Sequence, residues 1–259
     1  MNKRHRVQFP KNELSDSDQD ESYFYLHGTS KKRKIKFHDY DEIYQVPGLY
    51  EQIFYDRLKC ISPNKVTSIL ESAIKQSSDN FTELRVLDLG AGNGMMGEEL
   101  KKHGISRLVG VDIIPEAYDA LIRDRPGVYD AYYVEDFCAL SEGKKEEIES
   151  WQCDCMVTVA ALGFGDIPTK AFVNAFNIIS KEGWVAFNIK DTFLDTSDET
   201  GFSKLIRELI FSKYLDVYHI ERYRHRLSVD GEPLHYFAVV GRKNAAISSE
   251  FMESKGIVF

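Results

Sequence analysis

The chain has 259 residues, of which 43% are apolar and 12% are aromatic. This composition supplies enough apolar side chains for a full core, so it excludes a wholly disordered, collagen-like or low-complexity chain. No stretch approaches the ~20 consecutive apolar residues of a membrane span, and the first ten residues lead into acidic sequence rather than into the apolar run of a signal peptide. We therefore expect a soluble, cytoplasmic protein with no membrane partner.

The net charge of −8 is unevenly distributed along the chain. The first 40 residues carry a net charge of +3, whereas the remaining residues carry −11. An acidic body disfavours a broad surface for phosphate groups, so we do not expect nucleic acid as a partner. The run Lys31 to Lys36 (KKRKIK) is the exception, and it is more typical of a solvated charged tail than of a nucleic-acid patch.

By composition the sequence divides into four segments: an arm at residues 1–35, a helical lid at 36–80, an α/β domain at 81–245 and a C-terminal tail at 246–259. The arm mixes an acidic, serine-rich stretch with the basic run and shows no periodicity, which predicts weak order. The lid is dense in tyrosine and phenylalanine. Within it, Ser62 and Pro63 mark the start of a helix, as the cap and the first helical residue.

Apolar strands and amphipathic helices alternate along the α/β domain. Strands are predicted at residues 84–89, 107–112, 132–134, 154–160 and 184–189, and helices at 95–103, 115–124, 144–151, 169–179 and 202–211. Strand, helix and strand at this spacing require crossover connections, which predicts a mostly parallel sheet with helices on both faces. Two final strands, at 216–227 and 234–242, flank the hairpin signal Asp230-Gly231, so one of them must run antiparallel.

The most informative segment is Val86 to Gly97, VLDLGAGNGMMG. An apolar strand ends in an acidic residue, three glycines follow at every second position, and a helix begins at once. Glycine lets the backbone turn sharply and lets a ligand approach where any Cβ would clash. The start of the helix adds free N–H donors and the positive end of a dipole. This pattern predicts a turn that binds a ligand.

Two classes of ligand use such a turn. Gly92-x-Gly94-x-x-Gly97 matches the dinucleotide fingerprint, with Asp112 20 residues after its first glycine, and this frame predicts an NAD(P)- or flavin-dependent oxidoreductase. The other frame, D-x-G-x-G-x-G, starts at Asp88 directly after the strand. It is favoured because the dinucleotide frame leaves two extra residues after the strand and gives Asp88 no role.

From Asp88 the sequence resembles the class I methyltransferases that use S-adenosyl-L-methionine, whose first signature is very close to VLDLGAGNG. VGVDIIPEA resembles the end of their second strand and VEDFCAL the end of their third. The resemblance covers about residues 84–242. It implies a Rossmann-like, seven-stranded, mostly parallel sheet of order 3-2-1-4-5-7-6, with strand 7 antiparallel.

The same resemblance implies the cofactor site, with S-adenosyl-L-homocysteine as the product. Asp112 would accept hydrogen bonds from both ribose hydroxyls. Asp136 would accept from the adenine amino group, and the Phe137 backbone would read the ring. The expected cofactor-binding residues are Asp88, Gly90, Ala91, Gly92, Asn93, Asp112, Ile113, Asp136, Phe137 and Ala160.

The end of the fourth strand, Ala160-Ala161-Leu162, bears on the methyl acceptor. It matches neither the Asn/Asp-Pro-Pro-Tyr/Phe motif of nucleobase amino methyltransferases nor the Pro-Cys nucleophile of cytosine C5 enzymes. Small residues here leave room for the donor and a substrate, so we expect a small or medium-sized acceptor. The candidates for the substrate pocket are Tyr44, Tyr50, Leu162, Lys190 and Asp191.

No catalytic residue is assigned from the sequence. Methyl transfer from a sulfonium is a direct displacement, so alignment and exclusion of water can supply much of the acceleration. If the acceptor needs a base, the aromatic lid or the ends of the fourth and fifth strands would supply it. The seven histidines lack HExxH or comparable ligand spacing, so we expect no metal. The sequence predicts no particular oligomeric state.

Three further segments, AALGFGDIP, KEGWVAFNIKD and YRHRLSVDGEPLHYFAVVGRK, resemble the small branch of methyltransferase-like proteins first noted in the Williams-Beuren chromosomal region. We therefore interpret the chain as a methyltransferase. Besides the oxidoreductase, one more alternative stays open, which is a non-catalytic module that binds S-adenosylmethionine and recruits a partner through the basic arm.

Overall fold

A seven-stranded sheet forms the centre of the computed structural model, which describes residues 4–10, 22–28, 31–163, 166–194 and 201–257. The strand order is β6-β5-β4-β7-β8-β10-β9. The strands are β4 (Arg85–Leu89), β5 (Arg107–Asp112), β6 (Ala131–Val134), β7 (Cys155–Thr158), β8 (Trp184–Lys190), β9 (Leu215–Leu227) and β10 (Pro233–Lys243). Strands β4 to β8 pair in parallel, and β10 is antiparallel to both of its neighbours. The predicted order and the antiparallel seventh strand are confirmed.

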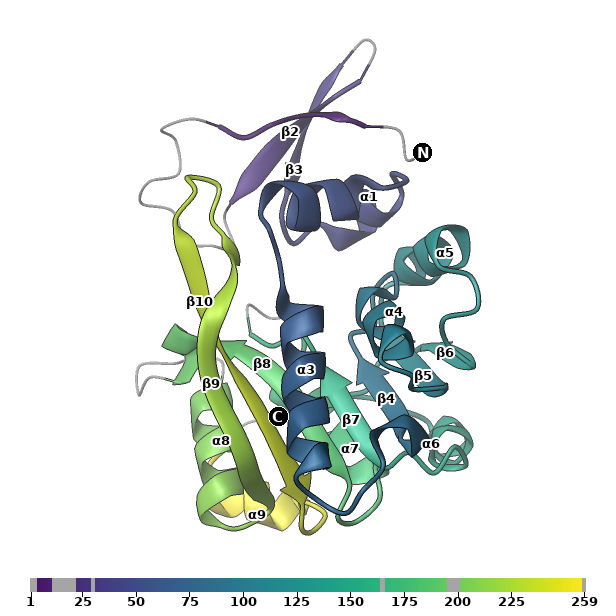
Figure 1. The fold of residues 1–259 in the computed structure, drawn as a ribbon, viewed down its shortest axis with the longest axis vertical. Coiled ribbons are helices and arrows are strands. Elements are labelled where there is room, and N and C mark those ends of the chain that lie inside the picture. Colours follow the sequence, from purple (N-terminus) through teal and green to yellow (C-terminus); the bar gives the residue numbers. More distant parts are fainter. Residues whose placement is uncertain (1–3, 11–21, 29–30, 164–165, 195–200, 258–259) are drawn as a thin grey trace.

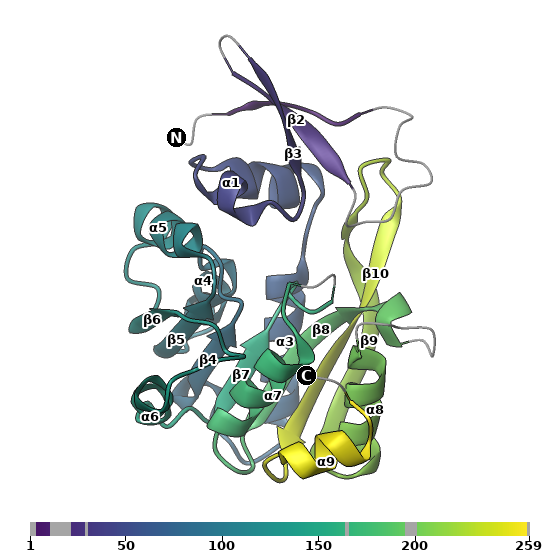
Figure 2. The same cartoon turned by 180° about the vertical axis from the view of Figure 1, so that it is seen from behind.

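Helices cover both faces of this sheet. One face carries α3 (Ser62–Lys75) and α4 (Met95–Lys102), as Figure 1 shows. The other carries α6 (Glu142–Glu149), α7 (Thr169–Ile178), α8 (Phe202–Phe211) and α9 (Ser249–Ser254), seen from behind in Figure 2. Successive strand residues point to opposite layers, so Val86 packs with side chains of α3 and Leu87 with side chains of α7. Helix α9 lies in the predicted tail, where buried Met252 packs into the second layer.

The N-terminal arm is a small antiparallel sheet of β1 (Arg6–Gln8), β2 (Tyr23–His27) and β3 (Lys32–Lys36). The prediction of weak order is therefore wrong for these strands, while residues 1–3, 11–21 and 29–30 lie outside the described part. The basic run is the edge strand β3, in which only Ile35 is buried. Lys32 and Lys34 lie over the rings of Tyr25 and Tyr23, at 3.4 and 3.7 Å from the ring centroids. Charged side chains protect an edge strand from pairing with another chain. They also remove the apolar alternation by which a strand is predicted from the sequence.

The segment predicted as a helical lid contains α1 (Tyr40–Tyr44), α2 (Leu49–Glu51) and a π-helical turn (Gln52–Arg57). These helices share one core with the arm, whose fully buried members include Phe24, Ile35, Phe37, Ile43, Leu49 and Ile53. The long β9–β10 hairpin extends beyond the main sheet to the arm (Figure 1). The N–H of Leu227 donates to the carbonyl of Leu58 at 2.7 Å, which ties the hairpin to the end of the lid.

The remaining helix of the α/β domain, α5 (Pro115–Asp124), contacts α1 of the lid as well as β5 and β6. Short 3-10 segments occur at Phe81–Glu83 and Asp191–Leu194. In the described part of the chain no helix is both long and apolar enough to cross a membrane. The division into four domains and the cytoplasmic location stay predictions.

Phe24→Ala tests whether the arm is part of the folded core. Phe24 has no exposed surface, so its truncation should leave a cavity and lower the free energy of unfolding by about 3–5 kcal/mol. The matched control is Phe211→Ala on α8, because this side chain is 78% exposed and should matter by at most ~0.5 kcal/mol. Urea denaturation of both variants measures the difference. Equal, small effects would contradict the packing of the arm on the lid.

Candidate active site

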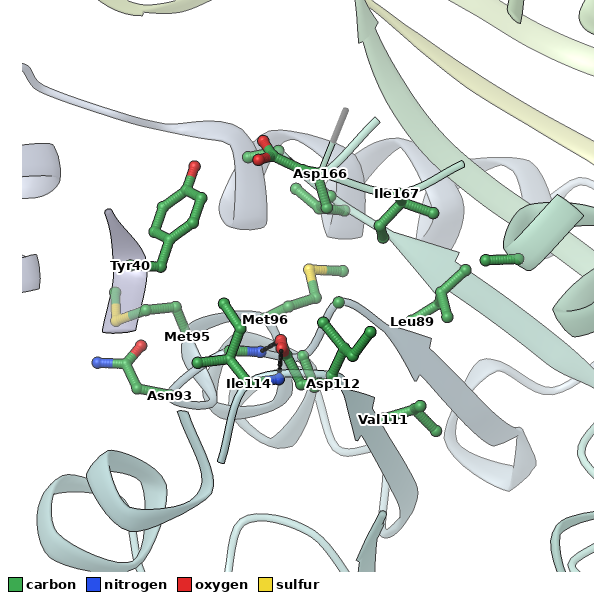
Figure 3. Close-up of a pocket in the computed structure, with 18 of the residues that line it drawn as sticks. Tyr40, Leu89, Asn93, Met95, Met96, Val111, Asp112, Ile114, Asp166 and Ile167 are labelled. Atoms are coloured by element: carbon green, nitrogen blue, oxygen red, sulfur yellow. Dashed lines mark hydrogen bonds between the residues drawn. The ribbon is translucent and has the colours of Figure 1, made fainter. Parts of the chain in front are cut away.

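A cavity of about 200 Å³ lies at the carboxyl ends of β4, β5 and β6, beneath the helices of the lid. Its walls come from the glycine turn after β4, the ends of β5 and β6, the segment after β7, and the lid tyrosines. Figure 3 shows Asp112 on one side of this cavity, with Tyr40 and Asp166 on the other. The topology therefore brings together residues that are far apart in the sequence, such as His38 and Asp166, which are 128 positions apart.

The glycine turn has a backbone that other residues rarely adopt. Gly90, Gly92 and Gly94 have φ values of +74°, +52° and +88°. A Cβ on Gly92 would lie 2.5 Å from the hydroxyl of Tyr44, and one on Gly90 would lie 2.9 Å from the Cβ of Ala161. Conformation and close approach both require glycine here.

Asp112 holds this turn at the end of β5. Its Oδ2 accepts from the N–H of Gly92 at 2.8 Å, and its Oδ1 accepts from the N–H of Ile114 at 3.0 Å (Figure 3). Burial raises the pKa of this carboxyl, and the backbone donors of Ile114 and Gly92 oppose the shift. Because each carboxylate oxygen has a second lone pair, Asp112 can still accept from two hydroxyls of a ligand in the cavity.

The end of β6 supplies the next part of the wall. Asp136 is exposed, lines the cavity, and accepts from the N–H of Cys138 at 2.7 Å. Phe137 is buried, and its carbonyl accepts from Asn174 Nδ2 at 2.6 Å. Together with Ile113 after β5, these residues give an apolar slot with acceptors at its edge.

Asn93 connects the glycine turn to the lid. Its buried side chain donates from Nδ2 to Glu51 Oε1 at 2.8 Å. Arg125 donates to the same Glu51 oxygen at 2.7 Å and to Glu98 at 2.8 Å. The turn is therefore anchored to α2 by a network of charge-assisted hydrogen bonds.

Asp88 differs from the sequence expectation. It is buried and does not line the cavity, and its Oδ2 accepts from the hydroxyl of Tyr129 at 2.6 Å. Burial raises the pKa of Asp88 to about 7, while the hydrogen bond from Tyr129 opposes the shift. Asp88 therefore does not reach the cavity in this structure, and its contact with the cofactor stays a prediction. Asp88 instead supports the turn from behind.

The other predicted residues are partly brought together. Gly90, Ala91, Gly92, Asn93, Ile113, Phe137, Ala160, Tyr44 and Tyr50 all line the cavity. Leu162 lines a second, smaller cavity of about 30 Å³. Lys190 and Asp191 line neither cavity, and Asp191 Oδ2 accepts from Arg222 Nη2 at 2.9 Å. Their place in the substrate pocket therefore stays a prediction, which neither cavity supports.

The pair formed by His38 and Asp166 was not predicted from the sequence. The Nδ1 atom of His38 lies 3.0 Å from Oδ2 of Asp166, and both residues line both cavities. His38 precedes α1 and Asp166 follows β7, so no local spacing in the sequence relates them. No cluster of three or more possible metal ligands occurs among the described residues, and the absence of a metal stays a prediction.

Ser62 also has a different role from the expected one. The helix α3 begins at Ser62, and the side chain makes no cap hydrogen bond. Its buried hydroxyl lies 2.6 Å from His225 Nδ1 and 2.7 Å from the hydroxyl of Tyr223. Ser62 therefore belongs to a buried polar network beneath the smaller cavity.

Asp88→Asn tests whether burial of the Asp88 carboxyl makes the stability of the fold depend on pH. The folded-state pKa of about 7 lies above the usual value of 3.8. The folded state therefore holds a proton that the unfolded state has lost. The resulting contribution to the free energy of unfolding is complete below about pH 4 and is lost as the pH rises through 7. The free energy of unfolding of the wild type should therefore fall more between about pH 5 and about pH 8 than that of Asp88→Asn. Exposed Asp119→Asn is the control, and parallel profiles for wild type and Asp88→Asn would contradict the burial.

Solved structures with the same fold have low sequence identity to this chain. An N-methyltransferase NodS from Bradyrhizobium japonicum WM9, in complex with S-adenosyl-l-homocysteine, is 13% identical, with a TM-score of 0.53 over 81% of this chain and 98% of that chain. A Thermoplasma acidophilum protein is 17% identical, with a TM-score of 0.51 over 78% and 98%. A Pyrococcus horikoshii protein, provisionally described as an RNA methyltransferase, is 17% identical, with a TM-score of 0.52 over 70% and 84%. These similarities show the fold alone.

The family assignment comes from the sequence match. Residues 64–229 match a family model described as a methyltransferase domain, which is more than half of the chain. No curated protein matches the sequence. The match favours the glycine frame that starts at Asp88 over the dinucleotide frame. The finer resemblance to the Williams-Beuren branch stays a prediction. With this fold and this match, the chain belongs to the methyltransferase-domain family.

Proposed function

We propose that this protein transfers a methyl group from S-adenosyl-L-methionine to a small or medium-sized acceptor by direct displacement. The observation that carries the proposal is the adjacency of two cavities under one lid. The main cavity and the smaller one share His38, Tyr40, Tyr50, Ala160 and Asp166. A donor in the first cavity and an acceptor in the second would meet at these residues.

The residues of the main cavity fit the cofactor in chemical type and position. Asp112 offers carboxylate lone pairs to a vicinal diol, and Ile113 and Phe137 offer apolar contact to a purine ring beside the carboxylate of Asp136. The glycine turn offers backbone groups without a Cβ between them and the ligand. When bound, S-adenosylmethionine supplies an electrophilic methyl group on a sulfonium.

The lid tyrosines serve binding and exclusion of water rather than proton transfer. Burial holds the pKa of Tyr40 and Tyr44 well above the usual value, and the pKa of Tyr50 is raised for the same reason. These phenols stay protonated and are poor bases. Their rings suit contact with a cation, and the ring centroids of Tyr44 and Tyr50 are 5.1 Å apart.

His38 is a better candidate for a base, where the acceptor requires one. It lines both cavities, and its Nδ1 pairs with the carboxylate of Asp166. The carboxylate of Asp166 at this distance fixes the orientation of the imidazole ring beside both cavities. Alignment of donor and acceptor would contribute further acceleration.

A small acceptor fits these residues better than a polymer does. The smaller cavity is about 30 Å³ and is walled by the lid, the segment after β7 and the β9–β10 hairpin. The net charge of −8 also disfavours a phosphate-rich partner. A non-catalytic binding module would have no need of the second cavity beside the first.

Asp112→Ala should weaken binding of S-adenosylhomocysteine by at least about tenfold, because a charge-assisted hydrogen bond to the ribose is lost. Asp112→Asn keeps acceptor capacity and should lose less. Asp119→Ala, an exposed change on α5, is the control. Isothermal titration calorimetry measures the three dissociation constants, and an unchanged value for Asp112→Ala would count against the ribose contact.

The acceptor class is tested with methyl-labelled donor and a cell extract separated into small-molecule, RNA and protein fractions. We expect label in the small-molecule fraction, because the second cavity is small, at about 30 Å³. The Asp112→Ala variant serves as the reference for background. Label confined to RNA or protein would overturn the acceptor assignment, and no label in any fraction would support a non-catalytic module.

A further inference from the structure

The smaller cavity contains a buried guanidinium. Arg226 on β9 is 5% exposed and lines this cavity. Its Nη1 donates to the carbonyl of Leu227 at 2.9 Å, and it forms no ion pair with any carboxylate of the described residues. The rings of Phe37 and Phe54 lie 5.8 and 6.0 Å from its Cζ. Aromatic faces and one carbonyl compensate a buried charge only in part.

A register shift in the hairpin brings Arg226 to the cavity. Arg224 pairs with His235 and Arg226 pairs with Leu234, so His225 has no partner of its own on β10. Such an extra residue, a β-bulge, interrupts the alternation of side chains along a strand and re-aims them. His225 and Arg226 are consequently both buried and both line the cavity, whereas Arg224 is exposed.

The buried network fixes the protonation of His225. Asn188 Oδ1 accepts from the N–H of Ala160 at 2.6 Å, so Asn188 Nδ2 must donate to Tyr223 and Ser62. Every hydroxyl proton then has an acceptor if Tyr223 donates to Ser62 and Ser62 donates to His225 Nδ1.

His225 therefore has its ring proton on Nε2. Burial and the charge of Arg226 hold the pKa of His225 well below its usual value, so the ring is neutral. Its Nδ1 faces the network, and the ring lines the cavity beside the guanidinium. The cavity thus offers a fixed cation and a neutral N–H donor, and no carboxylate of the described residues pairs with Arg226.

We infer that the smaller cavity binds a carboxylate group of the methyl acceptor, with Arg226 as its counter-ion and His225 as a second donor. This inference rests on the proposed function. Arg226 and His225 line the smaller cavity and not the main one, so the carboxylate anchors the acceptor while another of its groups faces the donor.

A carboxylate fits this cavity better than a phosphate does. One guanidinium presents two parallel N–H groups that match the two oxygens of a carboxylate. A phosphate dianion requires more donors, and among the described residues no lysine and no second arginine line the cavity of about 30 Å³. One carboxylate, that of Asp166, also lines the cavity. Its Oδ2 lies 3.0 Å from Nδ1 of His38, with which it pairs.

The test measures binding of three carboxylates (acetate, benzoate and phenylacetate), of their primary amides and of inorganic phosphate to protein saturated with S-adenosylhomocysteine. Ligand-observed NMR gives the dissociation constants. At least one acid should bind about tenfold or more tightly than its amide, because the amide is neutral and offers the guanidinium one acceptor oxygen instead of two. Arg226→Met, which keeps the apolar stem, should abolish this preference, and Arg226→Lys should retain part of it.

The control is Arg224→Met on the same strand, whose exposed side chain should leave the preference unchanged. The melting shift caused by S-adenosylhomocysteine reports separately on folding and on the cofactor site of each variant. Three results would overturn the inference: no acid preferred over its amide, the preference persisting in a folded Arg226→Met variant, or phosphate binding more tightly than every acid. If the wild type does not bind S-adenosylhomocysteine, the proposed function fails instead.

Discussion

The hydroxyl of Tyr44 lies 2.5 Å from the point where a Cβ on Gly92 would be. Any side chain at position 92 would separate the lid from the glycine turn. The N–H of the same glycine donates to Asp112 at the end of β5. One residue without a side chain thus connects the lid, the turn and the sheet, and the shape of the main cavity depends on it.

A second constraint lies in the backbone at Ala160, between the main cavity and the smaller one. Ala160 lines both cavities and has a φ of +59°, which costs a residue with a Cβ about 1 kcal/mol or more. The side chain of Asn188 on β8 accepts from the N–H of Ala160, and the network continues through Ser62 and Tyr223 to His225. The backbone between the two cavities is therefore held by the same groups that orient His225.

Most of the main sheet and its helices could be predicted from the sequence, because the apolar periods are clear and the ends carry local signals. The bounds of α5 and α8 agree with the prediction, since Pro115 and Gly201 mark their starts. The glycine turn with Asp112 was also predictable, because the acid and the glycines follow directly after strands. The order of the strands required the resemblance to a family.

The remaining features depend on tertiary contacts. Strand β3 was not predicted because four of its five residues are exposed and charged. Ile35 is its one apolar residue, and one residue shows no alternation. Simple alternation along β9 would put His225 and Arg226 on opposite faces, and only the register shift brings them to one cavity. Asp88 lies one residue before the end of β4, and its carboxylate accepts a hydrogen bond from the hydroxyl of Tyr129, which lies 41 positions away. These outcomes depend on residues far away in the sequence.

The most direct measurement of the central claim is a crystal structure of the protein with S-adenosylhomocysteine. The account predicts that the ribose hydroxyls lie within hydrogen-bond distance of Asp112, that the adenine ring lies between Ile113 and Phe137, and that the sulfur faces Ala160 beneath the lid tyrosines. An adenosyl group bound elsewhere, or with its ribose turned away from Asp112, would contradict it.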